Sequence, residues 1–382
     1  MIRIEVGFGN QSLPHKQLSM LIRQPNDSDI PQLQAFAARH FGNSHSADLP
    51  FTRFWFYREQ EGWTIRILED DAGLIAGLIY YIQAPARLHG QSVSMYWIST
   101  LFVDEARRQG GAGARLLLHA YKTLPLLGSM CGNHFSIPLS QMLGQTVADH
   151  KIRRFLYLLD PLAVQLAPPE VRAQLNEQQE RQQLLSAPTM HGEWAENLPD
   201  CYDALWHEFS LPLTCCIERS RDYMNRRYRE APYINYRFLL LWCGSELVGV
   251  VTVRLQSCLG KVISRIVDFV ATPKRSAEVW SQTLIACRDI GAIFADFFVL
   301  GSYQDSALLE AGWQLATDEN NLEYIPNLLT PLDYRRWSYS FHLGGTSLVS
   351  SNTKLQPDQV WFTKGDGDRD WPTPQLIAEQ KA

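Results

Sequence analysis

The sequence lacks the features that mark a disulfide-bonded, secreted or membrane-spanning protein. Its 7 cysteines are scattered and form no Cys-x-x-Cys pair, so we expect reduced thiols rather than a disulfide framework or a zinc site. The first residues, MIRIEVGFGN, contain no apolar stretch of the kind found in signal peptides. The longest apolar stretch, 238–253, is interrupted by polar residues and is too short to span a membrane. These absences predict a cytoplasmic protein with no membrane span.

An excess of positive charge is also absent. The chain has 35 Lys and Arg residues against 40 Asp and Glu residues, a net charge of −5. This balance argues against a protein that neutralises phosphate backbones, and it predicts no nucleic-acid partner. Lysine is scarce, and most of the basic residues are arginines. Because arginine suits fixed, bidentate contacts with anions, a local basic pocket for a phosphorylated small molecule remains compatible with the composition.

The chain does have the length and composition of an ordinary globular protein. Its 382 residues are 46% hydrophobic and 20% charged, and at roughly 150 residues per domain they predict two to three domains. Periodicity predicts the order β-α-β-β-β-loop-α-β-α-β, closed by a strand over 153–159, and a similar order recurs in the second half. We therefore expect an α/β protein in four parts: an N-terminal domain 1–165, a helical linker 166–199, a C-terminal domain 200–343 and a polar, irregular tail 344–382.

The most informative segment is STLFVDEARRQGGAGARL, residues 99–116, where a predicted strand ends and a helix begins. Its closely spaced glycines let the backbone approach a ligand, and the amides and dipole at a helix N-terminus favour an anion. Arg108 adds a cation, so the segment predicts a pyrophosphate cradle. It is not a Walker loop, because no Lys follows, nor a G-x-G-x-x-G fingerprint, because Leu116 replaces the last glycine. The alternative is a helix start whose glycines serve only a tight turn.

Arg108, Gly111 and Gly113 match a loop of the form [RQ]-x-x-G-x-[GA], and Asn133 and a short helix from Ser136 follow the next predicted strand. In these features the chain resembles the GNAT (GCN5-related) family of acyl-CoA N-acyltransferases. The resemblance implies two GNAT-like units in tandem, each a mixed, mostly antiparallel sheet flanked by helices. The second unit resembles the family in element order alone. The resemblance also implies acetyl-CoA or another acyl-CoA as cofactor, and direct transfer of an acyl group, expected to be acetyl, to an amine in a ternary complex.

The resemblance also implies where the cofactor binds. The main chain at the end of the strand would pair with the pantetheine arm, the glycine-rich loop would hold the pyrophosphate, and Asn133 would approach the thioester. No metal is expected. The cofactor-binding residues expected in this way are Leu101, Phe102, Val103, Arg108, Gln109, Gly110, Gly111, Ala112, Gly113, Ala114, Asn133 and Ser136.

Two features depart from the family pattern. Ser140 stands where the family commonly has a tyrosine that protonates the leaving thiolate, and serine is a poor general acid. The proton donor is therefore left open between another group and water. The second unit has no glycine at the loop position, 270–276, and Pro273 removes one donor. We expect no second CoA there, but a domain that shapes the acceptor site or packs on the first.

Two residues are predicted to be catalytic. His134 lies beside Asn133, where the acyl group is expected, and its pKa range suits a base. Asp268 interrupts an apolar strand, and a buried carboxylate needs either a positively charged partner or a functional role. It is predicted to orient the substrate amine. The alternative for His134 is a loop histidine that is hydrogen-bonded to the backbone. The alternative for Asp268 is a structural ion pair.

The segment 219–237 interleaves arginines with tyrosines. Aromatic rings stack on sugars or bases and arginines pair with phosphates, which predicts substrate binding by Arg226, Arg227, Tyr228 and Tyr236. With a loose resemblance to acyltransferases of surface polysaccharide biosynthesis, this favours a small-molecule acceptor such as a nucleotide-linked amino sugar. The alternative is an amphipathic helix with a solvated basic face.

The C-terminal acidic segment and two alternative functions give three further expectations. The acidic segment 366–370 resembles the start of a calcium loop but lacks its later Gly and Glu, so we expect a solvated tail. One alternative function is an aminoacyl or peptidyl transferase of the tandem-GNAT type, against which the net charge and the CoA loop argue. The other is a non-catalytic CoA-binding protein, which Ser140 favours.

Overall fold

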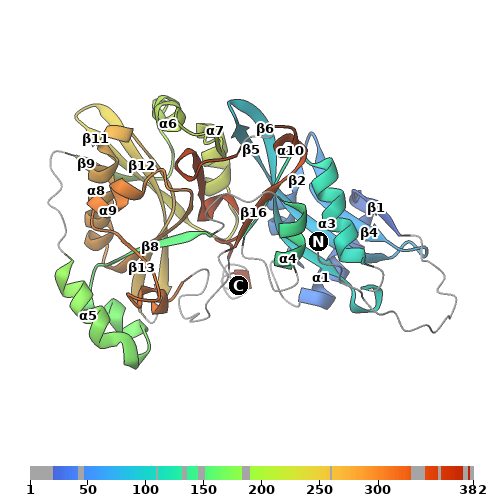
Figure 1. The fold of residues 1–382 in the computed structure, drawn as a ribbon, viewed down its shortest axis with the longest axis horizontal. Coiled ribbons are helices and arrows are strands. Elements are labelled where there is room, and N and C mark those ends of the chain that lie inside the picture. The colour runs from blue at the N-terminus through green and yellow to red at the C-terminus, as the bar shows by residue number, and fades with distance from the viewer. Residues whose placement is uncertain are drawn as a thin grey trace, which may run out of the picture.

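The computed structural model describes most of the chain: residues 20–41, 47–108, 111–130, 136–144, 151–182, 190–258, 260–327, 340–351, 354–372 and 377–378. Within these residues, 15 strands form one large, mostly antiparallel sheet. Figure 1 shows the N-terminal elements in blue and cyan, the later elements from green to orange, and the red C-terminal segment between the two groups. No described helix is long and apolar enough to cross a membrane. The mixed sheet flanked by helices confirms the predicted fold class.

The first group of elements builds a sheet with helices on both faces. β5 and its neighbours alternate their side chains between the faces, so Tyr80 packs with α1 and α2 whereas Tyr81 packs with α3. β6 and β7 run parallel, and the other pairs are antiparallel. The elements are β1 (Leu21–Arg23), α1 (Ile30–Phe41), α2 (Leu49–Phe56), β2 (Tyr57–Arg58), β3 (Gly62–Trp63), β4 (Ile65–Glu69), β5 (Ile75–Leu88), β6 (Gln91–Val103), α3 (Ala112–Thr123), β7 (Leu126–Met130) and α4 (Ser136–Leu143).

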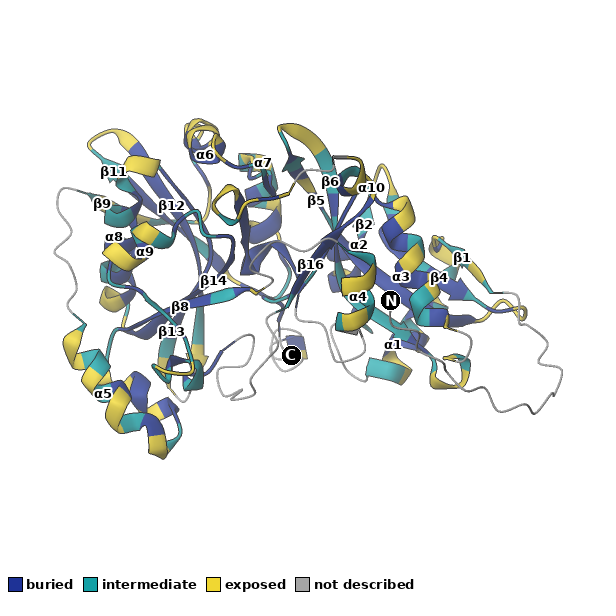
Figure 2. Cartoon of the chain, in the orientation of Figure 1, coloured by how far each residue is buried: buried dark blue, intermediate teal, exposed yellow. Residues whose placement is uncertain are grey.

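The second group repeats the general pattern with its own core. Trp280 of α8 stacks on Phe269 of β13 at 3.8 Å between ring centroids, which fixes that helix on the sheet. Figure 2 shows dark, buried strands beneath helices whose outer faces are exposed. The elements are β8 (Arg153–Leu158), α5 (Arg172–Arg181), β9 (His191–Ala195), α6 (Tyr202–Ser210), β10 (Cys215–Ile217), α7 (Arg221–Met224), a π-helical turn (Asn225–Arg229), β11 (Tyr236–Cys243), β12 (Glu246–Cys258), β13 (Lys261–Ala271), α8 (Ser276–Asp289), β14 (Ala292–Leu300), α9 (Asp305–Glu310) and β15 (Gln314–Leu315).

Two short strands join the groups. β10 pairs with β5 on one side and with β17 (Val360–Thr363) on the other, and β17 pairs in turn with β14. β16 (Phe341–Gly344) pairs with β7, and α10 (Thr346–Ser351) follows it. The sheet is therefore continuous from the first group to the second.

The structure corrects two expectations. The strand at 153–159 was predicted to close the first domain, but β8 pairs with β14 and β15 of the second group. The tail was predicted to be irregular and solvated, but β17 is buried inside the sheet. The carboxylates of Asp366 and Asp370 are also buried, because Arg219 and Lys364 neutralise them. The four-part division of the chain stays a prediction.

Candidate active site

β6 and β7 pair along only part of β6. Their parallel register ends at Ile98 and Ser129, whereas β6 continues to Val103 and stays paired with β5 over that length. Within the described part of the chain, the edge of 99–103 that faces away from β5 has no strand partner. An extended chain can bind to such an edge as an added strand.

A β-bulge lies at the point where the two strands part. Tyr80 of β5 is opposite Thr100, but Tyr81 is opposite Ile98, so Ser99 is the extra residue. A bulge bends its strand and redirects nearby side chains. The Ser99 hydroxyl is buried and has no hydrogen-bond partner among the described residues. Sequence reasoning missed this group, because a bulge leaves no local signature in the strand pattern.

The segment after β6 presents a cation beside the strand end. The Nε of Arg108 donates to the Val103 carbonyl at 3.0 Å, and its guanidinium lies 5.4 Å from the centre of the Phe102 ring. The neighbouring Arg107 is engaged elsewhere, since its Nη2 pairs with Asp70 at 2.7 Å. Arg108 is exposed and has no ion-pair partner among the described residues, so it is available to an anion.

The N-terminus of α3 has the geometry that the anion cradle requires. Gly111 precedes the helix with φ of 74°, a left-handed conformation that favours glycine, and no side chain caps the first amides. A Cβ on Gly113 would lie 3.8 Å from a methyl group of Val103, an ordinary contact. Packing in the described chain therefore does not demand glycine at 113, whereas the close approach of a ligand would.

The structure thus brings part of the predicted cofactor set together. Leu101, Phe102, Val103 and Arg108 lie at the end of β6, next to Gly111, Ala112, Gly113 and Ala114 at the start of α3. Ser136 is the first residue of α4. Gln109, Gly110, Asn133 and the predicted base His134 lie outside the described residues. The assignment of these residues to a cofactor stays a prediction.

A tyrosine lies beside Ser140, although it does not come from the predicted helix. The phenol of Tyr121, on α3, hydrogen-bonds the Ser140 side chain, and burial raises the pKa of Tyr121 to about 12. Both residues are buried. The hydroxyl therefore stays protonated at neutral pH. Sequence reasoning missed this residue because Tyr121 approaches α4 from a different helix.

Asp268 lies in a buried ion-pair network. Its carboxylate is fully buried, receives the Nε of Arg219 at 2.8 and 2.9 Å, and accepts the Tyr228 hydroxyl at 2.9 Å. The Nη2 of Arg219 continues to Asp366 in the tail at 2.7 Å. The structure thus realises the ion-pair alternative, while a role for Asp268 in orienting an amine stays a prediction.

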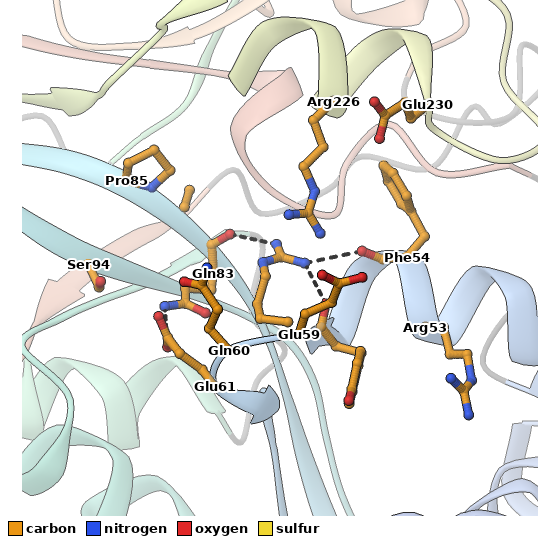
Figure 3. Close-up of a pocket in the computed structure, with 13 residues that line it drawn as sticks. Arg53, Phe54, Glu59, Gln60, Glu61, Gln83, Pro85, Ser94, Arg226 and Glu230 are labelled. Carbon is orange, nitrogen blue, oxygen red and sulfur yellow. Dashed lines mark hydrogen bonds between the residues drawn. The ribbon is translucent and has the colours of Figure 1, made fainter. Parts of the chain in front are cut away.

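The four residues predicted to bind substrate occupy different environments. Tyr228 and Tyr236 are buried, and their hydroxyls donate to Asp268 and Asp370. Arg226 is exposed and lines a pocket of about 750 Å³ between α2, the β2–β3 turn, β5 and the π-helical turn (Figure 3). Arg227 is buried and lines a smaller recess of about 100 Å³ that shares residues with this pocket.

No metal site accompanies these features in the described chain. No group of three or more His, Cys, Asp or Glu side chains among the described residues is placed to hold a metal ion.

No known family model and no curated protein matches the sequence. Solved structures do match the fold. A GCN5-related N-acetyltransferase from Anabaena variabilis ATCC 29413 aligns with a TM-score of 0.57 and 13% identity, over 85% of this chain and 72% of that chain. A conserved protein of unknown function from Enterococcus faecalis V583, described as a probable N-acyltransferase, aligns with a TM-score of 0.54 and 7% identity. The alignment covers 86% of this chain and 73% of that chain.

Saccharomyces cerevisiae N-myristoyltransferase with bound myristoyl-CoA and inhibitors aligns with a TM-score of 0.50 and 9% identity, over 91% of this chain and 83% of that chain. At such identities the similarity shows the fold alone. The chain therefore has a GNAT-type fold, a mixed α/β architecture around a mostly antiparallel sheet.

Proposed function

We propose that the protein transfers an acyl group from acyl-CoA to the amine of a small acceptor. The observation that carries the proposal is the open edge of β6 at 99–103, which ends beside Arg108 and the uncapped start of α3. One ligand with an extended arm and a pyrophosphate fits both features. Support also comes from the GNAT-type fold shared with a GCN5-related N-acetyltransferase and with an N-myristoyltransferase that binds myristoyl-CoA.

The proposed reaction is a direct attack within a ternary complex. The pantetheine arm pairs with β6 and places the thioester near Ser99. The amine nitrogen bonds to the thioester carbonyl carbon, the carbon–sulfur bond breaks, and the amine proton passes to a base, for which His134 is our candidate. Our candidate to donate a proton to the departing thiolate is the Tyr121 phenol, which is protonated and hydrogen-bonded to Ser140.

Narrower parts of the proposal rest on the sequence. They are an acetyl group as the cargo, a nucleotide-linked amino sugar as the acceptor, a second GNAT-like unit that shapes the acceptor site, and work in the cytoplasm. The arginines and tyrosines of 219–237 motivate the acceptor class.

Thiol release tests the proposal. The protein is mixed with acetyl-CoA and a panel of amines that includes amino-sugar nucleotides, and free CoA thiol is measured over time. We expect acceptor-dependent release with at least one amine. Binding of acetyl-CoA without thiol release from any amine would contradict a transferase and favour the CoA-binding alternative.

A further inference from the structure

The pocket in Figure 3 lies where two strands diverge along one edge of β5. β4 pairs with β5 up to Tyr80, and β10 pairs with it from Ala86 onward. Between these pairings, Arg58 of β2 reaches the strand and donates from Nη2 to the Gln83 carbonyl at 2.9 Å. The pocket is therefore lined by part of the β5 edge and by an arginine that is hydrogen-bonded to that edge.

Arg58 is a cation held by neutral groups. Its Nη1 donates to the carbonyls of Phe54 at 3.2 Å and Tyr57 at 3.0 Å, and no described carboxylate forms an ion pair with it. Burial, together with the charge of Arg226, lowers the pKa of Arg58 to about 10. The charge of Glu61 acts in the opposite direction and raises this pKa, but no ion pair joins the two residues. Arg58 stays charged at neutral pH with no directly bonded carboxylate among the described residues, which favours the binding of an anion.

Arg226 supplies a second cation to the same space. Figure 3 shows its side chain extending from the helix above into the pocket, and its charge acts on Arg58. Among the described residues it has no hydrogen bond or ion pair. It belongs to the π-helical turn Asn225–Arg229, and such turns are frequent at functional sites.

Arg227 supplies a third guanidinium in the inner recess. Its exposed fraction is only 4%, its Nε donates to the Gly365 carbonyl at 2.8 Å, and it lies over the Trp55 ring at 4.2 Å. Its Nη1 is buried without a partner among the described residues. A buried, unpaired charged donor is costly, so this atom indicates that a ligand supplies the missing acceptor.

The acidic residues around the pocket do not supply the missing acceptor. Glu61 accepts from the Gln83 side chain at 2.7 Å, and Glu59 and Glu230 are exposed. All three line the outer pocket and none lines the inner recess. The recess, lined by Arg58, Arg226 and Arg227 together with Trp55 and Tyr223, is therefore positive.

The recess and the open edge of β6 lie on opposite sides of the β5–β6 pair. Ile82, which lines it, is opposite Trp97 of β6, one residue before Ile98, where pairing with β7 ends. The recess adjoins the edge of β5 that faces away from β6, so with strands about 4.8 Å apart and a rise of about 3.3 Å per residue it is separated from the open edge by about 15 Å. A single small molecule can span that distance.

We propose that this recess binds an anionic group, a carboxylate or a phosphate, of an acceptor whose amine extends toward the open edge of β6. The assignment of the ligand as acceptor rests on the proposed function, whereas the binding of an anion does not. Three guanidinium groups provide charge-assisted hydrogen bonds, and the aromatic walls hold the linker.

Four matched probes test the proposal by isothermal titration calorimetry without acyl-CoA. They are 6-aminohexanoate with its neutral amide, and 6-aminohexyl phosphate with 6-aminohexanol. We expect at least one anionic probe to bind about tenfold or more tighter than its neutral partner, the effect of a hydrogen bond to a charged group. Whichever probe binds more tightly identifies the anion as carboxylate or phosphate.

The variant Arg226→Gln is the matched change, because this side chain is exposed and unpaired and its loss leaves the core intact. We expect it to remove most of the preference for the anionic probe and to leave neutral probes unaffected. Arg288→Gln, an exposed arginine of α8 paired with Asp289, is the control. The proposal is overturned if no anionic probe binds, if charged and neutral probes bind alike, or if the control loses the preference equally.

The same protein samples are then titrated with acetyl-CoA. If acetyl-CoA binds but the anionic probes do not, the recess is not an anion site, and the proposed acyl transfer is unaffected. If the anionic probes bind but acetyl-CoA does not, the recess is an anion site and the proposed acyl transfer is contradicted.

Discussion

Arg108 is the residue through which the cofactor proposal is most simply tested. Its guanidinium is exposed and held beside the end of β6 by the Val103 carbonyl, so replacement leaves the core unchanged. We expect Arg108→Gln to weaken acetyl-CoA binding about tenfold, because a charge-assisted contact to phosphate is lost. Calorimetry measures the change. Lys122→Gln, at the far end of α3, removes the same charge and should leave the affinity unchanged; an equal loss in both variants would contradict the assignment.

Tyr121 tests the chemistry rather than the binding. If its protonated phenol supplies the proton for the thiolate, Tyr121→Phe lowers kcat by about a hundredfold, in the range found for general acids. The affinity for acetyl-CoA stays the same, since the ring is kept. Ser140→Ala, which removes only the hydrogen-bond partner, should have a smaller effect. Steady-state kinetics with the active acceptor decide, and an unchanged kcat in Tyr121→Phe would exclude this role.

The sequence predicted residues whose role depends on their immediate neighbours. Gly111 and Arg108 could be recognised because a strand end, a glycine and a helix start are local features. Arg58 could not, because its setting depends on the Gln83 carbonyl of β5 and on Arg226 from the other half of the chain. Asp268 shows the intermediate case: a carboxylate in an apolar strand must be neutralised, but its partners are distant in sequence.

At the scale of elements, the contact between Gly301 and β17 shows how tightly the tail is held. Gly301 has φ of 93°, and a Cβ there would lie 1.8 Å from the Val360 carbonyl oxygen. Gly244 has φ of 61° with open space around it. We expect Gly301→Ala to lower the free energy of unfolding by about 3 kcal/mol, from strain and displaced backbone, against about 1 kcal/mol for Gly244→Ala.

Chemical denaturation of the two variants measures these losses. Similar values for both would mean that strain alone acts and that β17 does not pack against Gly301.

The strands themselves were easier to predict than their partners. Apolar runs bounded by turn residues marked β5, β6 and β13 from local sequence. The same signal cannot say that β8 pairs with β14 rather than with the first group, because pairing is decided by distant surfaces. β17 was missed because its four residues stand among Asp, Gly and Lys residues that resemble a solvated tail.

At the scale of the whole molecule, the continuous sheet makes the two groups of elements dependent on each other. β10 and β17 are each paired on both sides, and they connect β5 to β14. We therefore expect a single cooperative unfolding transition in calorimetry, with the calorimetric and van't Hoff enthalpies equal. Two separate transitions would show that the halves unfold independently and that this connection contributes little.

We propose above that acyl-CoA lies along the open edge of β6 and against the start of α3. Hydrogen–deuterium exchange with and without CoA tests it most directly, because a ligand that adds to a strand edge and binds helix amides slows exchange at those amides. We expect protection concentrated in residues 99–103 and 111–115. Unchanged exchange in both segments with CoA bound, or protection confined to the second group of strands, would contradict the account.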